Sequence, residues 1–179
     1  SGQLGDNTIV DKSSPIQIGA LTDWSFISAG NAYAIAIKTN GALWAWGINS
    51  NGRLGDNTVI NKSSPIQIGA LTNWSKISTY NHALSIKTDG TLWAWGVNGN
   101  GQLGDGTVLS KSSPVQIGAD TNWAAISAGS AHSLSVKSNG TLWAWGLNSS
   151  GQLGDNTIVD KSSPIQIGAL TNWLSVAAG

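Results

Sequence analysis

The sequence predicts an all-β protein, a β-propeller built from four-stranded blades. Three observations lead to this fold class. A segment of about 50 residues recurs along the chain, every copy contains short strand-like patterns, and no copy contains a helical pattern long enough to cover a sheet. Such a repeat, with about four strands in each copy, is typical of a propeller blade.

The repeat is defined by three motifs that return in the same order. GQLGD or GRLGD begins at Gly2, Gly52, Gly101 and Gly151, KSSP ends at Pro15, Pro65, Pro114 and Pro164, and LWAWG begins at Leu43, Leu92 and Leu142. We therefore treat residues 1–179 as a single tandem-repeat array. Its units are residues 2–51, residues 52–100, residues 101–150 and a partial repeat at 151–179.

Each repeat contains four candidate strands, and in the first copy three of them precede a glycine turn. Ile16–Ile18, after the proline, alternates apolar and polar residues with the period of a half-buried strand. The segment from Trp24 to Ala29 follows. In Ala34–Ile37, large aliphatic residues alternate with small ones, which again indicates a strand.

The last strand follows the turn. Asn40-Gly41 favours a type I′ turn, and the partner strand is the LWAWG segment that begins at Leu43. Tryptophans two residues apart in that segment point to one face of the sheet, and a buried tryptophan removes a large apolar area from water. We expect these tryptophans to form the structural core: Trp44, Trp46, Trp93, Trp95, Trp143 and Trp145.

Both faces of each predicted sheet carry apolar residues, so both must be covered. In the absence of helices, the copies must stack on one another, radially in a propeller or linearly in a solenoid. We expect the tryptophans of one blade to pack over small residues of the neighbouring blade, such as Ala83 and Ser85 in the second repeat.

The composition argues against several classes of protein. Nine basic residues balance nine acidic ones, and no basic cluster suggests nucleic-acid binding. The chain has no cysteine, and therefore neither disulfides nor a thiolate metal site. No apolar run is long enough to span a membrane.

Taken together, GQLGD, SAG, the AHSLSVK segment that ends at Lys137, the Asn-Gly or Asp-Gly turn and LWAWG resemble the regulator-of-chromosome-condensation repeat, here as a bacterial or phage-like tandem-repeat member. The resemblance covers the whole chain. It implies a seven-bladed β-propeller, and family members include nuclear exchange factors for small GTPases and a secreted β-lactamase inhibitor. The chain holds about three and a half blades, so the ring would be completed by missing sequence or by a second chain.

The open ends of such an array have consequences for partners. Terminal blades would expose apolar faces, which usually mark an interface. The chain is expected to be a segment of a longer array, since it lacks an initiating methionine and re-enters its first motif. Closure by a second copy, or an open superhelix of copies, is the alternative.

No catalytic, cofactor or metal site is expected. No Ser-His-Asp or Cys-His set can be assembled. His82 and His132 recur at matching positions, and two histidines without nearby carboxylates are better explained as hydrogen-bonding links to a neighbouring blade than as metal ligands. The aspartate of each GDNT or GDGT segment is expected to form a turn.

Positions at which the repeats differ are the best candidates for binding, because shared residues serve the shared fold. The candidate partner-binding rim consists of Phe26, Tyr33, Arg53, Lys76, Tyr80, His82 and His132. The predicted function is a non-enzymatic structural or protein-binding module, extracellular or associated with a cell surface or virion. A guanine-nucleotide exchange factor, by family analogy alone, and a glycan-binding module are the alternatives.

Overall fold

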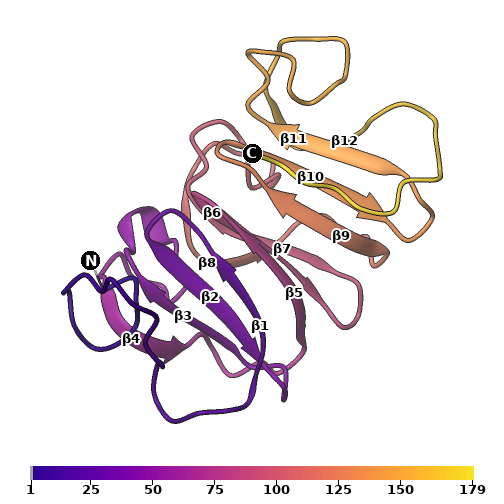
Figure 1. Cartoon of the computed structure of the whole chain (residues 1–179). Helices are drawn as coiled ribbons and strands as arrows, with labels where there is room; N and C mark the ends of the chain where they lie inside the picture. Colours follow the sequence, from indigo (N-terminus) through magenta and orange to yellow (C-terminus); the bar gives the residue numbers. More distant parts are fainter. Residues whose placement is uncertain (1) are drawn as a thin grey trace.

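The chain folds into three four-stranded antiparallel sheets, which the computed structural model describes for residues 2–179 (Figure 1). The strands of each sheet lie in sequence order. The first sheet contains β1 (Trp24–Ala29), β2 (Tyr33–Lys38), β3 (Leu43–Gly47) and β4 (Lys62–Gln67); the second contains β5 (Trp74–Thr79), β6 (His82–Lys87), β7 (Leu92–Gly96) and β8 (Lys111–Gln116); the third contains β9 (Trp123–Ala128), β10 (His132–Lys137), β11 (Leu142–Gly146) and β12 (Lys161–Gln166). A 3₁₀ turn, η1 (Ser50–Gly52), follows β3.

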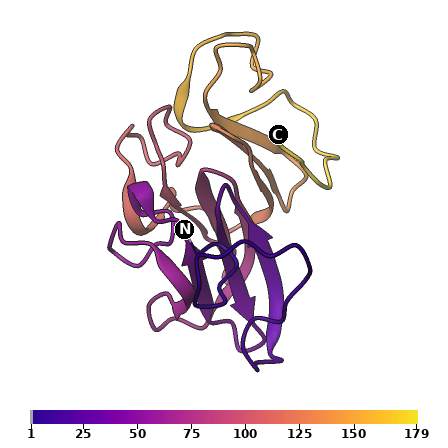
Figure 2. The same cartoon turned by 60° about the vertical axis from the view of Figure 1, so that its left-hand side comes forward.

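The predicted all-β architecture of four-stranded blades is confirmed. Each sheet is one blade, and the three blades stack face to face along the chain in both views (Figures 1 and 2). The first strands of successive blades contact one another, β1 with β5 and β5 with β9. The blades therefore converge along their first strands, and the fourth strands form the outer edges.

A blade takes its fourth strand from the following sequence repeat. β4 pairs with β3, with Lys62 opposite Gly47 and Gln67 opposite Trp44. The first blade thus crosses from residues 2–51 into residues 52–100. Ile16–Ile18, which the sequence predicted as a strand, is not one, because within residues 2–179 no LWAWG segment precedes it to serve as its partner.

The fourth strand also begins earlier than the sequence indicated, at Lys62, and it contains Pro65. Proline has no N–H to donate to a ladder and is therefore confined to edge strands or irregular positions. Both conditions hold here, because β4 is an outer strand and its pairing with β3 is irregular between Ala45 and Gly47.

The turn between β2 and β3 is not the predicted type I′ turn. Gly41 has φ +80°, whereas Asn40 is absent from the positive-φ residues, and the Gly41 N–H donates to the Lys38 carbonyl (2.8 Å). This is a type I turn followed by a left-handed glycine. The glycine is required by its neighbour as well as by φ, because a Cβ at this position would overlap the Thr72 carbonyl.

The two faces of a blade differ in chemistry. In the first blade, Trp24, Ile27 and the two tryptophans of β3 share one side with the small residues of β2, which we call the tryptophan face. The opposite side is formed by the large aliphatic residues of β2 and β3, such as Ile35 and Leu43, and we call it the aliphatic face. Equivalent residues give the other two blades the same two faces.

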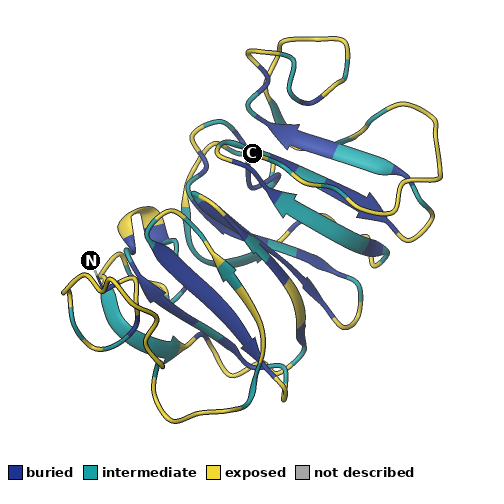
Figure 3. Ribbon diagram, in the orientation of Figure 1, coloured by how far each residue is buried: buried dark blue, intermediate teal, exposed yellow. Residues whose placement is uncertain are grey.

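Blades stack with the aliphatic face of one against the tryptophan face of the next. Ile35 and Leu43 of the first blade share a buried cluster with Trp74, Ile77 and Trp95 of the second. The second and third blades form an equivalent cluster. The resulting core lies in the central strands, and exposed residues concentrate in the connecting loops (Figure 3).

The predicted packing of tryptophans over small residues of a neighbouring blade is wrong. Ala83 and Ser85 lie directly opposite Trp95 and Trp93 in their own sheet, and paired residues project to the same face. The small residues leave room for the indoles beside them, so that both can meet the aliphatic face of the preceding blade.

This packing predicts that a leucine introduced at two equivalent positions, Ser85 and Ala36, lowers the free energy of unfolding by different amounts. Ser85 is fully buried between blades, and its hydroxyl donates to the Lys76 carbonyl (2.6 Å). Ser85→Leu should lower the free energy of unfolding by about 3 kcal/mol or more, because overpacking adds to the loss of a buried hydrogen bond. Ala36→Leu should cost less, because Ala36 is buried only by residues of its own blade, on a face that no other blade covers within residues 2–179. Chemical denaturation measures both, and Ser85→Ala separates the hydroxyl from the size effect. Equal losses for the two leucine variants would contradict the stacking described above.

Candidate functional site

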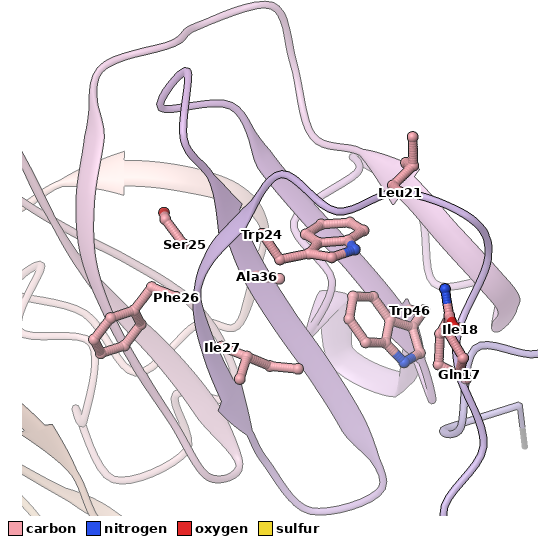
Figure 4. A pocket seen from close by; sticks show the side chains of 9 residues that line it. All are labelled: Gln17, Ile18, Leu21, Trp24, Ser25, Phe26, Ile27, Ala36 and Trp46. Carbon is pink, nitrogen blue, oxygen red and sulfur yellow. The ribbon is translucent and has the colours of Figure 1, made fainter.

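Within residues 2–179, no other blade covers the tryptophan face of the first blade. It borders a cavity of about 350 Å³ that is lined by residues of the N-terminal segment, β1, β2 and β3. Figure 4 shows the rings of Trp24 and Trp46 standing side by side, with Ile27 and Ala36 near them and Gln17 and Ile18 of the N-terminal segment facing Trp46. The cavity is mainly apolar, and its walls offer few hydrogen-bonding groups.

Equivalent residues in the later blades show what this face normally contacts. Ile27 is 62% exposed, whereas Ile77, at the same position of the second blade, is 4% exposed. Likewise Trp24 is half-buried, whereas Trp74 and Trp123 are buried. Ile77 and Trp74 pack against the aliphatic face of a preceding blade, whereas Ile27 has no such blade in front of it within residues 2–179.

The N-terminal segment covers part of the open face. The Trp46 indole N–H donates to the Gln3 carbonyl (3.1 Å), just as Trp95 donates to the Arg53 carbonyl (3.1 Å) in the next blade. The second tryptophan of the LWAWG motif is therefore buried in every blade. The first one (Trp44, Trp93 or Trp143) is only half-buried, which separates the six tryptophans expected in the core into two groups.

The structure places two of the predicted rim residues inside the protein. Tyr33 and His82 are buried at a blade junction, so the expectation that they form an accessible rim is wrong. The Tyr33 hydroxyl donates to the His82 carbonyl (2.9 Å), and His82 Nε2 hydrogen-bonds to the Ser133 hydroxyl (2.7 Å). The hydrogen-bonding interpretation is therefore confirmed for His82 and for Tyr33 at the matching position. His132, at the aliphatic face of the last blade, is half-buried.

The remaining rim residues lie at two different places. The Arg53 guanidinium donates to the Asn31 carbonyl (3.1 Å), and the Asn31 N–H donates to the Tyr80 carbonyl (2.9 Å), so Arg53 and the exposed Tyr80 lie near each other. Phe26 and Lys76 are exposed on the first strands instead. The Lys76 ammonium donates to a carbonyl of the following blade, that of Ala124.

Asn31 belongs to a polar ladder that the sequence analysis did not identify. Its side-chain amide donates to the Asn81 side chain (3.2 Å), and the Asn81 amide donates to the Ser130 carbonyl (2.9 Å). These residues occupy the same position in successive repeats, which is the signal that was available. They join the loops at one end of the blades.

A second group that the sequence analysis missed is a lysine held against tryptophans in each blade. The Lys87 ammonium lies 4.6 Å from the Trp74 ring centroid and 3.5 Å from that of Trp93. The two indoles meet edge to face at 5.8 Å. Burial lowers the pKa of Lys87, and the nearby Asp89 carboxylate offsets part of this shift. The two ring faces also attract the cation. Lys38 and Lys137 occupy the equivalent positions.

The aspartates of the GDNT and GDGT segments serve the loop that precedes the fourth strand. The buried Asn49 amide donates to Asp56 (2.9 Å) and to the carbonyls of Thr58 and Ile60 (3.1 and 3.2 Å). Burial raises the pKa of the Asp56 carboxyl, but the hydrogen bonds from Thr58 and Asn49 outweigh it, so the pKa lies below its ordinary value. The predicted turn role of these aspartates agrees with this geometry.

Residues 2–179 contain neither a cluster of candidate metal ligands nor a helix that could span a membrane. Among residues 2–179, no three His, Cys, Asp or Glu side chains lie close enough to hold a metal ion together. No helix in the same residues is both long and apolar enough to cross a membrane.

The buried His82 predicts a dependence of stability on pH. Burial lowers its pKa to about 3 from an ordinary value near 6.5, so below pH 6.5 the unfolded chain binds a proton that the folded protein does not. The contribution of His82 to the free energy of unfolding should therefore be fully present above pH 6.5. It should be lost as the pH decreases toward 3, by a total on the order of a few kcal/mol. Thermal melting between pH 7 and pH 4.5 measures the effect.

His82→Gln should flatten this dependence, because its side chain can hydrogen-bond Ser133 without titrating. The half-buried His132 is the matched control, and His132→Gln should keep most of the slope. An unchanged slope in His82→Gln would show that the dependence has another origin.

Comparison with known proteins agrees with the repeat and the fold. A family model described as the regulator of chromosome condensation (RCC1) repeat matches residues 40–79, 89–136 and 139–179, and a second model with the same description matches residues 24–53 and 123–152. None of the curated proteins compared matches the sequence.

Solved structures show a similar fold. Prp20p from Saccharomyces cerevisiae, studied for its binding to Gsp1p and histones, is 22% identical with a TM-score of 0.76, over 84% of this chain and 39% of that one. Yeast RCC1 (Prp20) bound to Kap60 is 20% identical with a TM-score of 0.80, over 94% and 43%. Human WBSCR16 is 18% identical with a TM-score of 0.60, over 99% and 63%. The chain thus spans less than two thirds of each, and none of the three comes from a bacterium or phage, so the expected bacterial or phage-like origin is not supported.

Proposed function

The chain belongs to the regulator of chromosome condensation (RCC1) repeat family, and from this premise we propose that it is a non-enzymatic, protein-binding β-propeller module that binds through the open faces of its terminal blades. The partner that fits the open tryptophan face is an aliphatic blade face like those inside the molecule. A second copy of this chain carries such a face on its third blade.

The contrast between Ile27 and Ile77 carries this proposal. Ile27, with no blade in front of it within residues 2–179, is 62% exposed, whereas Ile77, which packs against the first blade, is 4% exposed. Leu21, which lines the cavity at this face, is also about half exposed. An exposed apolar surface of this kind on a soluble domain usually marks an interaction site.

The third blade supports the same interpretation from the other end. Leu134 and Leu142 of its aliphatic face are half-buried, whereas Leu84 and Leu92 at the equivalent positions of the second blade are fully buried. Residues 173–179 extend along the third blade, with the Ala178 N–H donating to the Ser127 hydroxyl (2.9 Å). This segment contributes no LWAWG tryptophans, so the face keeps a partial opening for those of another blade.

Two further features of the proposal follow from the sequence. The absence of a catalytic set supports a binding role, and the low charge supports an extracellular or particle-surface setting. The exchange-factor alternative rests on family analogy alone, which is weak ground for function. A nucleotide-release assay on a panel of small GTPases separates it, because activity there would replace the present proposal.

We expect the chain to associate head to tail in a concentration-dependent way. Ile27→Glu should weaken this association at least tenfold, because a carboxylate would be buried in an apolar junction without a partner. Sedimentation velocity over a range of protein concentrations measures the change.

The control is Ile60→Glu, which introduces the same charge at a residue that is 64% exposed in the loop before β4, away from both open faces. It should associate as the unmodified chain does. A chain that stays monomeric at every concentration, or equal effects of the two substitutions, would overturn the proposal that a second copy is the partner.

A further inference from the structure

The same cavity recurs at successive blade positions on the outer side of the tryptophans. We call it the junction pocket. Three copies have volumes of about 360, 370 and 370 Å³ and are lined by Trp24 and Trp44, by Trp74 and Trp93, and by Trp123 and Trp143. Such volumes lie within the range typical of small-ligand sites.

The second junction pocket lies between the first and second blades. Its apolar walls are the indoles of Trp74 and Trp93, the Pro114 ring of β8 and the exposed Leu71. Trp93 is the half-buried tryptophan of its motif. Its orientation is fixed by Lys87 against the ring and by a hydrogen bond from its N–H to the Thr91 hydroxyl (2.9 Å).

Apart from one carboxylate, the polar groups of this pocket are neutral, and some of their hydrogen-bonding atoms have no intramolecular partner in the described chain. The Gln67 amide donates to the Gly69 carbonyl (3.1 Å), which leaves its carbonyl oxygen without an intramolecular partner in the described chain. The Ser113 hydroxyl likewise has no hydrogen bond within residues 2–179. The exposed Asn57 keeps its amide donors, and the single carboxylate, Asp56, is paired with Lys62 (3.5 Å).

We propose that the junction pocket binds a neutral pyranose of a glycan. The aliphatic face of a sugar ring suits an indole wall, and its hydroxyls suit amide and hydroxyl groups that both donate and accept. The lack of an unpaired charge favours a neutral ligand over an anionic or cationic one. Repetition of weak sites at blade spacing suits a polymer of repeated units, because several sites then act together.

The third junction carries a natural variation of the same pocket. Gly106 stands where the second pocket has Asn57, and Asp120 stands where it has Leu71. Asp120 forms an ion pair with Lys137 (2.6 Å) at the edge of this pocket. The third pocket thus lacks the amide and the apolar wall, and we assign sugar binding to the first and second pockets alone.

Exchanging the residues of the second and third pockets tests the proposal. Each substitution introduces a residue that this chain already carries at the equivalent position of another repeat. Asn57→Gly with Leu71→Asp gives the second pocket the residues of the third. Both positions are exposed, and Gly106 has φ +79° where Asn57 has φ +62°, so the backbone accepts either residue. The probes are glucose, galactose, mannose and N-acetylglucosamine at millimolar concentration, observed through the indole N–H signals of the tryptophans in NMR spectra.

At least one of these sugars should shift the Trp93 signal and leave that of Trp143 unchanged. The double variant should weaken binding at Trp93 at least tenfold while the Trp44 signal still responds. The reverse change, Gly106→Asn with Asp120→Leu, should create a response at Trp143. The second pocket, where the test is read, shares no lining residue with the open tryptophan face, so either proposal can fail alone.

Three outcomes would overturn the inference: no response to any of the four sugars, equal responses at Trp93 and Trp143, or an unchanged response in the double variant. A proline-rich peptide that shifts Trp93 where no sugar does would assign the pocket to a different class of ligand. Retention of the folded spectrum in both variants is checked by the dispersion of the remaining signals.

Discussion

The structure depends on one constraint, which is that every sheet is apolar on both faces and no α-helix covers either face within residues 2–179. A sheet of four short strands cannot bury two faces by itself, so stability must come from neighbours of the same kind. The observed clusters have this form, since each joins the aliphatic face of one blade to the tryptophan face of the next. The self-association proposed above would therefore use the same kinds of face as folding.

The chemical difference between the two faces gives the array a direction. Tryptophans face the preceding blade and branched aliphatic residues face the following one. Polar groups follow the same direction, because Tyr33 donates to the next blade and His82 bonds to the one after it. Apolar contacts provide most of the burial, while these hydrogen bonds, which tolerate little displacement, set how one blade is registered on another.

Period-two alternation was enough to predict the two central strands of each blade, their faces and the need for stacking, because these depend on local sequence. The errors concern features decided by neighbours. The turn at Asn40-Gly41 has the dipeptide of a type I′ turn, but the nearby Thr72 carbonyl limits the space at Gly41. His82 differs between repeats as a binding residue might, and only the position of Ser133 in the next blade shows that it is buried. The boundary between blades could not be predicted for the same reason, because the KSSP segment of one repeat pairs with the LWAWG strand of the preceding repeat.

The half-buried tryptophans link the core to the surface of the molecule. Trp95 and Trp145 are enclosed by a loop carbonyl and the preceding blade, and Trp46 by the Gln3 carbonyl and residues of its own blade. The tryptophans two residues earlier reach the junction pockets instead. Stacking fixes both indoles of a strand. A ligand that binds at the outer indole would therefore contact a side chain that is already ordered, and little further conformational entropy would be lost on binding. Discrimination between junctions then falls to residues that stacking leaves unconstrained, such as Leu71 and Asp120. In a repeat protein of this kind, specificity can change at one junction without disturbing the packing on which all of them depend.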